Sequence, residues 1–375
     1  MMPIPPRLLA VCCLCAVLSL AGCSVRPPTT IPRPMLSYLG QIRVPADATF
    51  DGTPIGGLSG ISFDADSQAY YVISDDYSEK GPARFYTVRL SLSDKGISDV
   101  AITGMYPLLD ASGHPFEHQN LESRPPVVPP DPEGIAFDSA RHRLYWSSEG
   151  ERLTDGPPLL LESWLRIAAP DGASLGQFTL PANLAMSAQR TGPRRNRALE
   201  GLTLTPDGRS LFAAMEDPGY NDGPLKDGDR QVLTRITKFE AAPAAPTAQY
   251  AYPLEPPAWP AGFNGVSDLV ALSDTTFLVL ERSNALPPLV RIFRAEIGTA
   301  TDVLAMPSLQ GATLTAMSKS LVVDLSALSS PKDPVYNIEG ITLGPKLPDG
   351  RQSVVLVSDN DFSPSQVTQF LLFAM

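Results

Sequence analysis

Three features of the sequence predict an all-β fold. Short apolar runs rich in β-branched residues are separated by turns that draw on 28 glycines and 39 prolines. No stretch shows a long apolar period of 3.6 residues with helix caps. A similar unit also recurs along the chain, which is typical of a repeat architecture. Many short strands with Gly and Pro turns indicate an antiparallel β domain.

The recurring unit is clearest in residues 337–362. A Glu-Gly turn at Glu339 enters an apolar strand, Pro348-Asp349-Gly350 reverses the chain, and a second apolar strand ends on acidic residues. Apolar, β-branched runs around a Gly-containing turn predict a hairpin. Five such units align, and their equivalent positions are 74, 67, 67 and 72 residues apart. These positions are Ser59, Glu133, Glu200, Ser267 and Glu339.

Each unit has room for two further strands. They are expected at 84–92 and 100–108, at 160–168 and 175–180, and at 231–239 and 247–254. Four antiparallel strands per unit at near-even spacing predict the blades of a β-propeller. The last unit offers one further strand, 367–373, and the N-terminal segment 36–44 would complete it and close the ring. The count gives five blades, and the long interval 298–336 leaves a sixth open.

The N-terminus resembles a bacterial lipoprotein signal. Arg7 precedes a short apolar run, and Leu20-Ala21-Gly22-Cys23 resembles a lipobox, in which the cysteine is lipid-modified. An ordinary secretory signal or a membrane anchor is the alternative, although the run is short for a bilayer span. Ser24, rather than Asp, after Cys23 favours the outer membrane. We expect a signal peptide (1–22), a stiff proline-rich tether (23–34) and a globular domain (35–375) that faces the periplasm.

Composition excludes several chemistries. All four cysteines lie at or before position 23, so the expected mature domain has no thiol for a disulfide, a metal or a nucleophile. The net charge of −11 argues against nucleic acid and suits either cation binding or solubility. No Gly-x-Ser-x-Gly nucleophile elbow is present. We expect a monomer that contacts the membrane through its lipid anchor only.

The glutamates of the repeat are the main site candidates. Inner strands of a propeller line its central channel, so Glu133, Glu200 and Glu339 should converge there. Gathered carboxylates repel one another unless a cation neutralises them. Oxygen ligands in such number fit Ca²⁺ better than Zn²⁺. We predict that these glutamates bind the metal or orient the attacking water. In the alternative interpretation, each Glu-Gly turn caps or hydrogen-bonds the backbone of a neighbouring blade.

Further acidic residues extend this prediction. Asp268 stands beside the equivalent position in the fourth unit, and Asp75 and Asp359 end second strands. We include all three among the predicted metal ligands. Acids that end second strands surround the same mouth or, alternatively, lie in surface turns.

A basic cluster precedes Glu200 in this acidic chain and contains Arg190, Arg194, Arg195 and Arg197. Guanidinium groups bind phosphate and carboxylate in a bidentate manner. We predict that Arg194, Arg195 and Arg197 bind an anionic substrate. A solvated loop, or a patch that pairs with acids, is the alternative.

Three stretches resemble the phytase-like domain family, described as having "esterase-like activity of phytase". They are residues 199–208, residues 266–272 with 278–282, and residues 337–365. The resemblance covers about residues 45–373 and implies a secreted or periplasmic propeller that hydrolyses ester or phosphoester bonds. Propeller phytases hold Ca²⁺ at the channel mouth, where it binds phosphate and activates water, although their metal sites show no residue-by-residue correspondence with this chain.

The combined prediction is an exported hydrolase that uses metal-activated water at the channel mouth. Its substrate would be a small ester or anionic molecule. The alternative is a non-catalytic propeller that serves as a binding or scaffold lipoprotein of the cell envelope.

Overall fold

The computed structural model describes residues 1, 35–257, 262–284, 289–328 and 334–375. Apart from Met1, the predicted signal peptide, the tether and Cys23 lie outside the described residues. Residues Met35–Met375 form one compact unit. Within the described part of the chain, no helix has the length and apolarity needed to cross a membrane.

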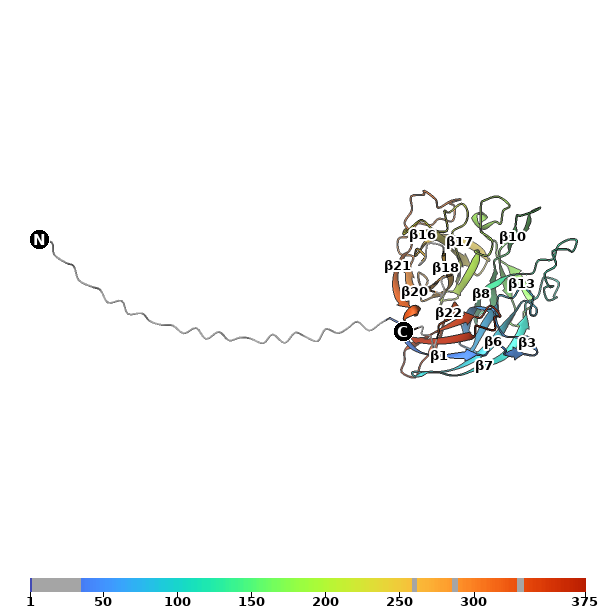
Figure 1. Cartoon of the computed structure of the whole chain (residues 1–375), viewed down its shortest axis with the longest axis horizontal. Helices are drawn as coiled ribbons and strands as arrows, with labels where there is room; N and C mark the ends of the chain where they lie inside the picture. Colours follow the sequence, from blue (N-terminus) through green and yellow to red (C-terminus); the bar gives the residue numbers. More distant parts are fainter. Residues whose placement is uncertain (2–34, 258–261, 285–288, 329–333) are drawn as a thin grey trace. The chain divides into compact units, whose positions relative to one another are not determined.

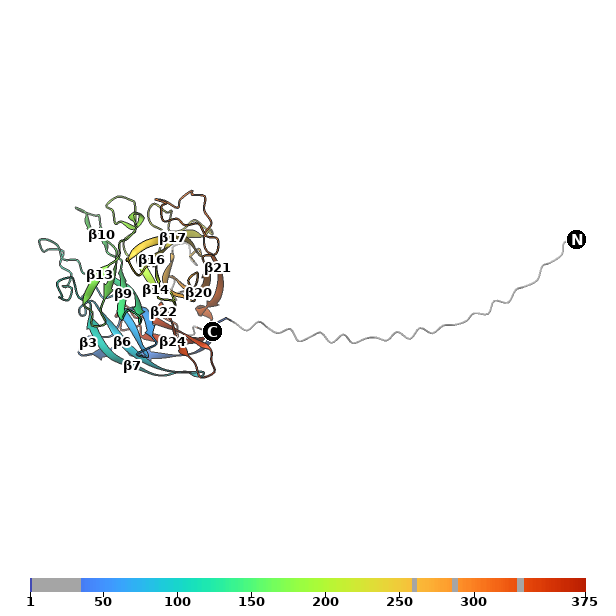
Figure 2. The same cartoon turned by 180° about the vertical axis from the view of Figure 1, so that it is seen from behind.

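This unit is a five-bladed β-propeller, and the predicted fold class is confirmed (Figures 1 and 2). Blade 1 contains β4 (Leu58–Asp64), β5 (Ala69–Ser74), β6 (Arg84–Ser93) and β7 (Gly96–Pro107). Blade 2 contains β8 (Pro132–Asp138), β9 (Arg143–Ser148), β12 (Trp164–Ala168) and β13 (Ser174–Gln177). Blade 3 contains β14 (Leu199–Leu204), β15 (Ser210–Met215), β16 (Val232–Glu240) and β17 (Ala245–Leu254). Blade 4 contains β18 (Asn264–Ala271), β19 (Thr276–Ser283), β20 (Leu289–Glu296) and β21 (Ser318–Asp324). Blade 5 contains β22 (Asn337–Lys346), β23 (Gln352–Asp359), β24 (Thr368–Ala374) and β1 (Ser37–Val44).

Short elements decorate these blades. Two-residue strands β2 (Thr49–Phe50) and β3 (Thr53–Pro54) form one hairpin, and β10 (Glu151–Leu153) and β11 (Leu159–Leu161) form another. The expected strand 160–168 is therefore divided between β11 and β12. The 3-10 turns are η1 (Ala182–Leu184) and η2 (Leu325–Ala327).

The two ends of the propeller chain pair with each other. β1 lies antiparallel to β24, from Ser37 opposite Ala374 to Val44 opposite Thr368. In Figure 1 the blue β1 accordingly lies beside the red C-terminal strands. This closure confirms the predicted pairing of the terminal strands. The interval 298–336 supplies no sixth blade, because β21 within it pairs with β20 as the fourth strand of blade 4.

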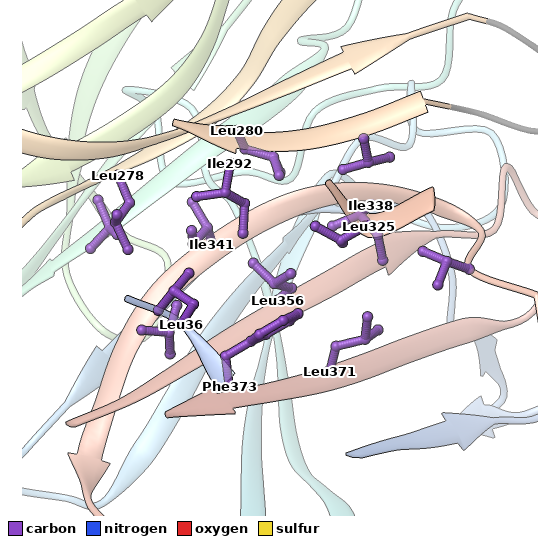
Figure 3. Packing of buried hydrophobic residues seen from close by; sticks show 14 residues of the cluster. Leu36, Leu278, Leu280, Ile292, Leu325, Ile338, Ile341, Leu356, Leu371 and Phe373 are labelled. Carbon is purple, nitrogen blue, oxygen red and sulfur yellow. The ribbon is translucent and has the colours of Figure 1, made fainter. Parts of the chain in front are cut away.

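The blades pack face to face through apolar side chains. In β23, Val354 and Leu356 pack toward blade 4, whereas Val355 and Val357 pack toward blade 1. Successive side chains of a strand point to opposite faces, so a strand buried on both faces is a continuous apolar run. Figure 3 shows the first of these interfaces, where Leu278 and Ile292 face the side chains of blade 5.

Inner strands lie close around the propeller axis and carry a β-bulge at the same place in every blade. The register against the second strand shifts at Ser59, Glu133-Gly134, Glu200-Gly201, Ser267 and Glu339. A Cβ on Gly134 would lie 2.4 Å from the carbonyl oxygen of Glu200. A Cβ on Gly201 would lie 2.6 Å from Cα of Asp268. Glycine therefore follows these glutamates because neighbouring strands leave no room for a side chain.

Candidate metal centre at the channel mouth

Two sets of equivalent positions meet at the end of the channel where the inner strands begin. The first set is the bulge set, which includes Glu133, Glu200 and Glu339. The second set lies at the ends of the second strands. Each member comes directly after the second-strand residue that pairs with the last inner-strand residue before the bulge. The set consists of Asp75, Glu149, Glu216, Arg282 and Asp359. The alternative that these second-strand acids lie in surface turns is wrong, because Glu149, Glu216 and Asp359 are buried.

The carboxylates of the two sets approach one another in three groups. Asp75, Glu133 and Glu339 form the first group. Asp131, Glu133 and Glu149 form the second, and Glu149, Glu200 and Glu216 form the third. Within each group, one oxygen from each residue lies within 4.8 Å of the others. The structure thus brings together the three predicted glutamates and Asp75, and it adds acidic neighbours from the strand ends.

A pocket of about 560 Å³ opens over the first group. Asp75, Glu133 and Glu339 line it together with Glu200 and Asp359. Five of the six predicted metal ligands therefore border one cavity. Glu200 and Asp75 are half-buried, whereas Glu133, Glu339 and Asp359 are buried.

Burial and mutual repulsion raise the pKa values of this cluster. Burial is the main cause for Glu133, whose pKa lies well above its ordinary value, and the charge of Glu200 adds to it. The pKa values of Asp75, Glu200, Glu149 and Asp359 shift in the same direction. Burial raises the pKa of Asp131 to about 7 and that of Glu216 to about 8. Such shifts mark a site where negative charge lacks compensation.

Arg282 reverses the charge at one of the five second-strand positions. Its Nη2 lies 3.0 Å from Oε1 of Glu339, and its Nε donates to Oγ of Ser267 at 3.3 Å. Burial would lower the pKa of this guanidinium, but Glu339 and other carboxylates outweigh burial and raise it. Arg282 is the only Lys or Arg among the described residues that line the pocket.

Asp268 lies on the inner strand of blade 4 but does not line this pocket. It stands where the other inner strands have glycine. Its Oδ1 accepts from the backbone N–H groups of Leu202 at 3.2 Å and Leu269 at 2.8 Å, and its Oδ2 accepts from Ile341 at 2.8 Å. Leu202 belongs to blade 3 and Ile341 to blade 5. Asp268 therefore links three inner strands, so the geometry favours the alternative role of a backbone partner over its predicted role as a metal ligand.

The predicted substrate-binding arginines do not line the pocket. Arg195 pairs with Glu151 at 2.7 Å, and Arg197 pairs with Asp217. Arg194 donates to the carbonyl oxygens of Pro218 at 2.9 Å and Gly223 at 2.8 Å. The ion pairs of Arg195 and Arg197 agree with the alternative that this cluster pairs with acids. Their assignment to the substrate stays a prediction that the geometry does not favour.

A family model described as "Phytase-like: Esterase-like activity of phytase" matches residues 53–362. The chain belongs to the phytase-like family. The resemblance expected from the sequence is thereby confirmed, and the matched range of this phytase-like chain contains all the acidic residues of the three groups. No curated protein shows significant sequence similarity to it.

Solved structures with weak similarity to the phytase-like chain include three bacterial proteins. A GH43 protein mutant of Bacillus licheniformis has 9% identity and a TM-score of 0.42, and the match covers 85% of this chain and half of that protein's length. A periplasmic gluconolactonase of Pseudomonas aeruginosa has 13% identity and a TM-score of 0.36, with 88% and 93% covered. A gluconolactonase of Xanthomonas campestris has 10% identity and a TM-score of 0.35, with 93% and 99% covered. Similarities of this size carry no information on substrate.

Sequence reasoning missed two residues of the phytase-like site, Asp131 and Arg282, and for Glu149 and Glu216 it left open a place at the mouth or in a surface turn. Glu149 and Glu216 were visible as acids that end second strands, but a strand end does not reveal burial. Asp131 lies two residues before Glu133, outside the repeat alignment. The equivalence of Arg282 with the acids depends on the bulge register, which places it one residue beyond Glu281.

Proposed function

We propose that this chain hydrolyses ester or phosphoester bonds of small anionic substrates, with Ca²⁺ held at the channel mouth. The observation that supports this proposal is the first carboxylate group. Asp75, Glu133 and Glu339 come from three different blades and gather at a pocket large enough for a small ligand. A family described by an esterase-like activity is consistent with hydrolysis.

The donor atoms of this group fit a hard cation. All three ligand atoms are carboxylate oxygens, and histidine and cysteine are absent from the group. Ca²⁺ binds six to eight oxygens at about 2.3–2.6 Å, so two ligands of one ion can be about 5 Å apart. The ligand atoms of this group lie within 4.8 Å of one another, which agrees with that limit. When bound, such a cation polarises an ester or phosphoester oxygen and lowers the pKa of water.

Other pocket residues have separate roles in this proposal. Glu200 lies on the wall contributed by blade 3, where its carboxylate can accept a proton or orient water. Arg282 provides a planar guanidinium for the anionic group of the substrate. A cation that neutralises Glu339 would free the Arg282 nitrogen that now faces that carboxylate.

Turnover of p-nitrophenyl esters and p-nitrophenyl phosphate tests the proposal. Purified protein is stripped with a chelator and assayed with and without added Ca²⁺. We expect Ca²⁺-dependent turnover that falls about 100-fold in Asp75→Asn and in Glu200→Gln. Asp274→Asn, in the exposed turn after β18, is the matched control and should retain wild-type turnover.

Two results would contradict parts of the proposal. Unchanged turnover in Glu200→Gln removes Glu200 from the reaction. Absence of turnover in protein whose melting temperature rises with Ca²⁺ leaves a cation-binding propeller without hydrolysis, which is the alternative function.

A further inference from the structure

The buried carboxylate of Glu149 presents an oxygen that no described group satisfies. Its Oε1 accepts the backbone N–H of Ala198, whereas its Oε2 is buried without a hydrogen-bond partner among the described residues. The residue is 1% exposed. An unpaired buried carboxylate oxygen is strongly unfavourable, so an ionised Glu149 requires a counter-charge beside it.

Glu149 belongs to a carboxylate group that is separate from the one proposed to hold the catalytic cation. Glu149, Glu200 and Glu216 share no residue with Asp75, Glu133 and Glu339. The remaining group, around Asp131, uses Glu133 and Glu149 and so overlaps both. Two cations can therefore each bind three carboxylates without sharing any, whereas a third cation would have to share ligands with both.

The surroundings of Glu216 leave space for its carboxylate beside Glu149. A Cβ on Gly265 would lie 2.6 Å from Cγ of Glu216, so the glycine of blade 4 makes room for this side chain. Two guanidinium groups act on Glu216: Arg197, whose Nη1 is 3.9 Å from its Oε2, and Arg282. Arg197 is already paired with Asp217 and Arg282 with Glu339, so these two guanidinium groups are shared among five carboxylates.

From this geometry we infer that Glu149, Glu200 and Glu216 hold a second divalent cation at the seam between blades 2 and 3. Their donor atoms are all carboxylate oxygens within 4.8 Å of one another, which suits Ca²⁺. Glu149 and Glu216 are buried, and neither lines the pocket. This cation therefore joins two blades, and it positions Glu200 in the pocket wall. The inference rests on the proposed function only in taking the first group as occupied.

Counting bound Ca²⁺ tests the inference. Chelator-treated protein is dialysed to equilibrium against Ca²⁺, and the bound metal is measured by elemental mass spectrometry. We expect two Ca²⁺ per chain for the wild type and for Asp274→Asn, one for Glu216→Gln and one for Asp75→Asn. Glu149→Gln should also bind one, and it replaces Glu216→Gln if that variant fails to fold by circular dichroism.

The outcomes separate this inference from the proposed function. A wild type that binds a single Ca²⁺, lost in Asp75→Asn, overturns the second site and leaves the first intact. Two Ca²⁺ retained in both Glu216→Gln and Glu149→Gln also overturns it. Two Ca²⁺ with the expected losses, but without turnover, supports both cation sites and removes the hydrolase assignment alone.

Discussion

At the channel mouth, neighbouring strands determine which side chain fits at equivalent positions of the inner strands. Glycine at 134 and 201 is required because a side chain there would overlap the next inner strand. Asp268 occupies the same place in blade 4 and instead accepts three backbone N–H groups. Burial raises the pKa of Asp268, while these hydrogen bonds oppose that shift. A carboxylate, which only accepts hydrogen bonds, suits such a cluster of donors.

Asp268→Asn tests this role, since the amide replaces an acceptor oxygen with a donor. One of the three N–H contacts would then face an NH₂ group. We expect the free energy of unfolding to fall by about 2 kcal/mol. Chemical denaturation measures the loss, with Asp274→Asn as the control. The number of bound Ca²⁺ should not change, and a lost Ca²⁺ with unaltered stability would instead make Asp268 a ligand.

Strands in this propeller are stabilised through both of their faces. Leu356 of β23 is fully buried against blade 4, while its sequence neighbours Val355 and Val357 pack toward blade 1. Burial of a Leu side chain contributes about 1.5–3 kcal/mol. The edge strand β21 differs, since Leu321 is 54% exposed. A leucine therefore contributes more to the stability of the fold in this second strand than in this fourth strand.

Leu356→Ala and Leu321→Ala form a matched pair for that difference. We expect Leu356→Ala to lower the free energy of unfolding by about 2–5 kcal/mol, because it leaves a cavity between blades. Leu321→Ala should change it by less than about 0.5 kcal/mol. Urea denaturation followed by tryptophan fluorescence measures both. Similar effects of the two substitutions would contradict the packing of β23 between blades.

At the scale of the whole molecule, ring closure brings like charges together. Blades 1, 2, 3 and 5 each contribute acidic residues to the mouth, and blade 4 contributes Arg282. A carboxyl whose pKa is higher in the folded chain binds its proton more tightly there. Between the unfolded and the folded pKa, stability therefore falls as pH rises. For Glu216 this window runs from 4.5 to about 8.

The stability of chelated protein should accordingly depend on pH. We expect its melting temperature to fall as pH rises from about 5 to about 8, because the mouth carboxyls lose protons while they remain buried. Added Ca²⁺ should raise the melting temperature more at pH 8 than at pH 5, since protons compete with the cation. Thermal unfolding by circular dichroism measures both. A melting temperature that rises with pH in the chelated protein would be the opposite result.

Local pattern was sufficient for the blades. Contacts within a hairpin or between neighbouring strands produce a repeating sequence pattern. That pattern consists of the apolar runs, the Gly-containing turns and the spacing of Glu133, Glu200 and Glu339. The closure of β1 on β24 could also be predicted, because one unit lacked a strand and the other terminus supplied one.

The composition of the charged centre depended on the tertiary structure. Glu149 and Asp359 end strands as many surface acids do, and only the neighbouring blades make them buried. The bulge in β18 places Arg282, rather than Glu281, at the mouth. Arg195 and Arg197 form ion pairs with acidic residues outside the pocket. These outcomes depend on which residues, distant in the sequence, are buried together away from water. No local sequence pattern specifies that arrangement.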